Sequence, residues 1–79
     1  MPRKTPEREI AEQCFDGARR TLGDGWGHVS TELQWGLVAS KILDVLLNQP
    51  ASVPPAEIVA YMHTLHSEAF GIMAENSPV

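Results

Sequence analysis

The chain has 79 residues, of which 43% are hydrophobic, and its ten acidic and six basic side chains give a formal net charge of −4. This length fits one small domain, and the hydrophobic content argues against a wholly disordered chain. No run approaches the ~20 apolar residues that span a bilayer, no apolar signal segment follows the basic N-terminus, and a single cysteine cannot form an internal disulfide. We therefore expect a cytoplasmic protein of prokaryotic type without membrane attachment.

The first predicted helix covers residues 6–22. Thr5 is a suitable N-cap, Pro6 suits the first helical position, and Gly23 can end the helix. We expect residues 1–4 to be a disordered basic arm. Cys14 lies on the apolar face, where we expect a small core residue rather than a nucleophile, because reactive thiols need partly exposed, electropositive surroundings. The residues of this face are Ile10, Ala11, Cys14, Phe15, Ala18 and Leu22.

The second predicted helix covers residues 31–48 and contains the most apolar stretch of the chain, 35–47. Its apolar arc is about twice as wide as a surface helix needs, so we expect it to contact neighbours on two sides. Thr31 and Gln34 have the spacing of a capping box at its start. Gly36 lies within the apolar arc, which predicts close approach of a neighbouring backbone there.

The third predicted helix covers residues 55–74, within a single helical domain of residues 5–75 followed by a frayed tail, 76–79. No segment alternates with a period of two, so we predict an all-α three-helix bundle. The second and third helices carry more apolar surface than three small helices bury, which predicts a homodimer through the third helix and part of the second. The apolar face of the third helix comprises Ile58, Val59, Met62, Leu65, His66, Ala69, Phe70, Ile72 and Met73.

Two features outside the helical pattern are candidates for function. Trp26 lies between glycines in the connection 23–28, beside His28, and is either a plug for the end of the bundle or an exposed anchor for a partner. His63 and His66 are one helical turn apart, but zinc needs three or four ligands and no acidic residue has the matching spacing. We therefore expect no metal, no cofactor and no catalytic residue.

The sequence favours a small, non-enzymatic protein–protein interaction module, a homodimeric regulator or adaptor. One alternative is an inhibitor of phage or plasmid type whose acidic C-terminal half occupies a basic nucleic-acid-binding partner. The other is a weak DNA-binding regulator of helix-turn-helix type, although nucleic-acid binding usually needs clustered Lys and Arg and residues 31–41 contain one lysine. The candidate partner-binding residues are Trp26, His28, Glu57, Tyr61, His63, His66, Glu68 and Phe70.

Overall fold

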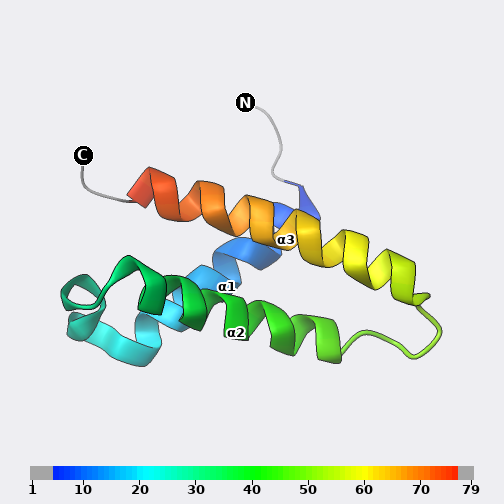
Figure 1. The fold of residues 1–79 in the computed structure, drawn as a ribbon, viewed down its shortest axis with the longest axis horizontal. Helices are drawn as coiled ribbons and strands as arrows, with labels where there is room; N and C mark the ends of the chain where they lie inside the picture. Colours follow the sequence, from blue (N-terminus) through cyan, green and yellow to red (C-terminus); the bar gives the residue numbers. More distant parts are fainter. Residues whose placement is uncertain (1–4, 77–79) are drawn as a thin grey trace.

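The computed structural model describes residues 5–76, which form three α-helices and one short 3₁₀ segment (Figure 1). These residues contain no β-strand, so the predicted all-α three-helix bundle is confirmed. The expected basic arm, 1–4, and the last three residues of the expected tail lie outside the described residues. The elements in chain order are α1 (Pro6–Leu22), the 3₁₀ segment η1 (Gly23–His28), α2 (Thr31–Leu47) and α3 (Pro55–Asn76).

Helix α1 begins and ends at the predicted residues. The backbone N–H of Arg8 donates a 3.1 Å hydrogen bond to the Thr5 hydroxyl, which satisfies one of the free amide groups of the first turn. At the other end Gly23 has a positive φ of 54°, and its N–H donates to the Arg19 carbonyl. A residue with a Cβ would be strained in that conformation, so glycine is required there.

Helix α2 begins at Thr31 as predicted, but Ser30 and not Thr31 is its N-cap. The backbone of Ser30 is extended and its hydroxyl accepts a 3.2 Å hydrogen bond from the Leu33 N–H. Serine and threonine can both cap a helix, and the capping-box spacing indicated Thr31, one residue after the observed N-cap. The helix ends at Leu47, and the Asn48 side chain donates a 2.6 Å hydrogen bond to a carbonyl of the last turn.

Helix α3 begins at Pro55 as predicted but continues to Asn76, beyond the predicted end at residue 74. The side-chain amide of Asn76 donates a 2.8 Å hydrogen bond to the Ile72 carbonyl in the preceding turn. This residue, expected in the frayed tail, is therefore the last helical residue.

The helices lie in two layers. Helices α2 and α3 run antiparallel in one layer, and α1 crosses behind both (Figure 1). The shortest dimension of the molecule is 16 Å, which is the thickness of two packed helices. All three helices contribute to one core between the layers, which consists of Ala11, Cys14, Phe15, Ala18, Val38, Ile42, Leu65, Ala69, Ile72 and Met73.

Arg8 connects the start of α1 to the end of α3. Its guanidinium lies 2.7 Å from the Glu75 carboxylate, 3.3 Å from that of Glu12 and 3.6 Å from that of Glu68. The hydrogen bond to Glu75, helped by that to Glu12, raises the pKa of Arg8. The first and last turns of the described chain are thus held together by one cation and three carboxylates.

Helix α2 contacts both α1 and α3, as expected, but one of its sides is covered by neither. It fully buries only Val38 and Ile42, whereas Leu43 and Leu47 are exposed. Nothing approaches within 4 Å of the position that a Cβ would take at Gly36, so the predicted close backbone contact is wrong. The physical reason is that Gly36 lies on the uncovered side of the helix.

Leu65 is completely buried, and Leu65→Ala should lower the free energy of unfolding by about 3 kcal/mol because it leaves a cavity in the core. Leu33 is 48% exposed, so Leu33→Ala, the same chemical change, should cost less than about 1 kcal/mol. Urea unfolding followed by circular dichroism, at one protein concentration, measures both. Equal losses would contradict the assigned position of the core.

Replacing Arg8 by Met should loosen the end of α3, because the variant keeps much of the side-chain volume and removes the charge that holds Glu68 and Glu75. We expect faster amide exchange in the last turn of α3, and a melting temperature that falls less with added salt than that of the wild type. Arg20→Met, which removes an exposed cation at the other end of α1, is the matched control. An unchanged exchange rate at residues 73–76 would show that the contact does not hold this end.

Candidate protein-binding surface

The side of the α2–α3 layer that faces away from α1 carries exposed apolar side chains. Two contacts identify the sides of α2 and α3 that face α1. Lys41 of α2 lies against Gly17 of α1, and Glu68 of α3 lies against Arg8 of α1. A residue two positions further along a helix points about 200° away. Leu43 and Phe70, which are 52% and 67% exposed, therefore point away from α1.

We call this surface the α2/α3 face. Its members recur every three or four positions, so on each helix they form one continuous stripe. None of them is Asp, Glu, Lys or Arg. An uncharged patch of this extent is unusual on a monomer and typically marks a binding site. The face consists of Trp35, Gly36, Ala39, Leu43 and Leu47 of α2 and Val59, His63, His66, Phe70 and Met73 of α3.

Ring contacts join the two stripes. The Trp35 ring lies 5.6 Å from the His66 ring and 6.1 Å from the Phe70 ring, and both pairs are edge-to-face. Aromatic pairs in this arrangement attract each other beyond the area that they bury. His66 is half-buried in this contact, whereas the Phe70 ring remains largely in solvent. Trp35 thus fixes the position of α2 beside α3 on the open side.

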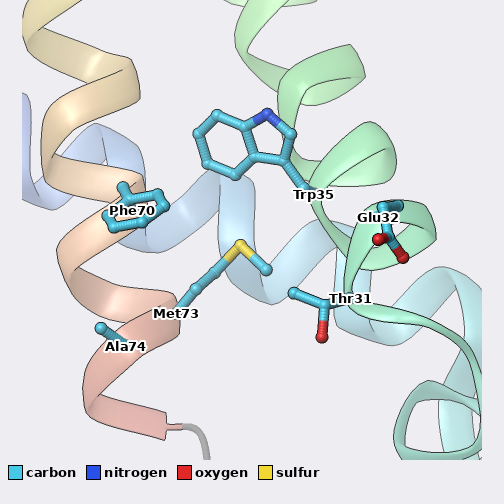
Figure 2. Close-up of a pocket in the computed structure, with 6 residues that line it drawn as sticks. All are labelled: Thr31, Glu32, Trp35, Phe70, Met73 and Ala74. Atoms are coloured by element: carbon cyan, nitrogen blue, oxygen red, sulfur yellow. The ribbon is translucent and has the colours of Figure 1, made fainter.

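A pocket of about 710 Å³ lies at one end of the face, between the start of α2 and the end of α3. Figure 2 shows the Met73 side chain extending from α3 toward Thr31, below the Trp35 and Phe70 rings, with Thr31 and Glu32 along the α2 wall. The carboxylate of Glu32 is the only charged group among the lining residues. An apolar side chain of another polypeptide would fit this cavity. The pocket is lined by Thr31, Glu32, Trp35, Phe70, Met73 and Ala74.

Three of the candidate residues from the sequence, His63, His66 and Phe70, lie together on the α2/α3 face. Trp26 is elsewhere, in η1, where its ring packs edge-to-face on Phe15 with centroids 5.6 Å apart. This contact matches the interpretation of Trp26 as a plug at the end of the bundle.

His28, the last residue of η1, is exposed. The η1 segment is tied to α2, because the side chain of Gln34 donates a 2.6 Å hydrogen bond to the Trp26 carbonyl. His28 therefore belongs, with Trp26, to the end of the bundle where α1 passes into α2.

The remaining candidates do not belong to the face. Tyr61 packs against the core, and burial, followed by the charge of Glu7, raises the pKa of its phenol. Glu68 is engaged by Arg8, and Glu57 is exposed in the first turn of α3. The eight candidates are therefore spread over several surfaces.

Seven residues of the face were not among the candidates: Trp35, Gly36, Ala39, Leu43, Leu47, Val59 and Met73. The broad apolar arc of residues 35–47 was the available signal. Periodicity gives the width of an apolar face, but it does not specify which of its residues the other helices leave exposed.

Cys14 is buried in the core, as expected. Burial raises the pKa of its thiol, and the negative charge of Asp44 adds to that effect, whereas Lys41 opposes it. A buried thiol with a raised pKa is a poor nucleophile, because the thiolate is the reactive form.

Among residues 5–76, no group of three or more His, Cys, Asp or Glu side chains is arranged to hold a metal ion. None of the helices in that part of the chain is both long enough and apolar enough to cross a bilayer. Comparisons with known protein families, with curated proteins and with solved structures find no match for this chain.

Cys14 should react with iodoacetamide at pH 8 at least about tenfold more slowly in the folded protein than in urea, because reaction requires local opening and ionisation of a thiol whose pKa is raised. Mass spectrometry of timed samples measures both rates. A Thr21→Cys variant, which adds a thiol at an exposed position of α1, is the internal control and should react at the new site as fast as an unfolded peptide. Equal rates at the two thiols would contradict the burial of Cys14.

Proposed function

We propose that this chain is a non-enzymatic protein–protein interaction module that binds a polypeptide on the α2/α3 face. The observation that carries the proposal is the exposure of Leu43, Leu47, Val59 and Phe70 on one uncharged surface beside an apolar pocket. Covering such side chains releases about 25 cal/mol for each Å² of apolar area removed from water. The large aromatic residues Trp35 and Phe70 are of the kind that dominates binding energy at interfaces.

The distribution of charge supports this choice of surface. Between Trp35 and Leu47 the charged residues are Lys41 and Asp44, and between Val59 and Phe70 the charged residue is Glu68. All three lie off the face, so binding there removes no charge from water apart from Glu32 at the rim of the pocket. Burial of an unpaired charge would oppose association.

The two alternative functions receive less support from the same structure. An inhibitor with an acidic surface needs clustered free carboxylates, and in the C-terminal half Glu68 and Glu75 are both engaged by Arg8 whereas Glu57 is exposed at the other end of α3. A DNA-binding regulator needs many exposed cations, but among residues 5–76 Arg19 and Arg20 form one exposed pair, Arg8 is surrounded by carboxylates and the methylene chain of Lys41 lies along Gly17. The apolar face is thus the surface better equipped to bind a macromolecule.

The proposal predicts that Phe70→Lys abolishes binding, because the charge enters the face beside Trp35, at the end with the pocket. Tagged wild-type, Phe70→Lys and Gln13→Lys chains are used as baits in a lysate of the natural host, and retained polypeptides, including untagged copies of this chain, are quantified by mass spectrometry. Proteins retained by the wild type should fall at least about tenfold with Phe70→Lys.

Gln13→Lys is the matched control, because Gln13 is exposed on α1, in the other layer of the bundle, and the substitution adds the same charge. It should retain the same polypeptides as the wild type. A Phe70→Lys bait that folds, as judged by circular dichroism, and still retains them all would refute the assignment of this face as the binding surface.

A further inference from the structure

We infer that the occupant of the α2/α3 face is a second copy of this chain, related to the first by a two-fold axis. The axis lies in the plane between the two copies, at the centre of the face, and runs across the helices. This inference rests on the proposed function and specifies the partner. In the resulting dimer α2 and α3 of each copy form the two inner layers, and the α1 helices lie outside.

The two ends of the face have complementary shapes. At the Trp35–Phe70 end the surface is hollow, with the pocket of about 710 Å³. At the other end the aliphatic side chains of Leu47 and Val59 are 73% and 49% exposed. One end thus offers a cavity and the other offers side chains that can fill a cavity.

The spacing of these two ends suits a two-fold arrangement. Trp35 and Leu47 are twelve residues apart on α2, and Val59 and Phe70 are eleven apart on α3, so the ends are separated by about 16–18 Å along both helices. A two-fold axis midway between them exchanges the ends. It places the Leu47–Val59 end of each copy over the pocket of the other, so that both cavities are filled by the same contact.

Charge also favours a second copy. The chain carries a net charge of −4, so two copies repel each other at most orientations. The α2/α3 face contains no carboxylate, and the carboxylates of Glu68 and Glu75 are held by Arg8 on the side turned toward α1. Contact through this face keeps those like charges apart. For a strongly charged partner, Glu32 is the one charged group among the residues that line the pocket with which it could pair.

The first test is the mass of the purified full chain by light scattering over a hundredfold range of concentration. We expect twice the 8.7 kDa of the chain, and we expect Leu47→Lys and Phe70→Lys each to raise the dimer dissociation constant by about a hundredfold, since each substitution enters the interface twice. Gln13→Lys, on the outer side of α1, should remain as dimeric as the wild type. Circular dichroism establishes that each variant is folded.

The second test determines the orientation. Val59→Cys and Phe70→Cys variants are mixed and treated with a short bis-maleimide. The two variants should cross-link to each other and not to themselves, because the axis brings residue 59 of one copy to residue 70 of the other. The wild type, whose single thiol at Cys14 is buried, should not cross-link.

A monomer at every concentration would overturn the inference, as would a dimer that both lysine substitutions leave intact. Self-cross-linking of each variant at the yield of the mixture would overturn the two-fold arrangement. Failure of this inference can be distinguished from failure of the proposed function. If the chain is a monomer but loses its retained proteins with Phe70→Lys, the face is still a binding surface, and its occupant is another protein.

Discussion

The packing of α1 against both other helices is the constraint on which the rest of the structure depends. The buried side of α1 is built largely from small residues, Ala11, Cys14 and Ala18, with Phe15 as the one large side chain. Small side chains let the axes of neighbouring helices approach closely, so α2 and α3 can both lie on this one helix. Because two helices rest on one, the bundle has two layers, and the far side of the α2–α3 layer has no cover.

The uncovered side is stabilised in part by contacts within its own layer. Trp35 packs edge-to-face on the rings of His66 and Phe70, and these contacts join α2 to α3 at the end where the pocket lies. On the opposite side, Lys41 lies along Gly17 and Arg8 holds Glu68 and Glu75. The long stems of such cations cover apolar surface while their charges reach water or a carboxylate. The two sides of the layer therefore differ sharply: one is charged and closed, and the other is apolar and open.

Local signals in the sequence were sufficient for the helices and for part of the core. Thr5, Pro6 and Gly23 mark the ends of α1 because capping acts through neighbouring atoms, and the same reasoning failed by one residue at Ser30, where two adjacent residues can each cap. Exposure was harder to predict. Phe70 and Leu65 have similar periodicity signals, yet one is largely in solvent and the other is fully buried, because which part of a wide apolar arc is covered depends on where α1 crosses. The contact of Arg8 with Glu75 joins residues 67 positions apart, and no pattern in the sequence specifies such a pair.

That contact has a consequence for how this domain can be joined to other polypeptides. Thr5 begins the described chain one helical turn before Arg8, and Asn76 follows Glu75 directly, so chain entry and exit lie at the same edge of the bundle. A domain whose two ends leave along one edge can be inserted into a surface loop of a host protein without either connection passing around the bundle. The inserted domain would stand out from its host with the edge near Arg8 as its base. The broad surface formed by α2 and α3 would then project to the side, accessible for display or for reversible assembly of the host.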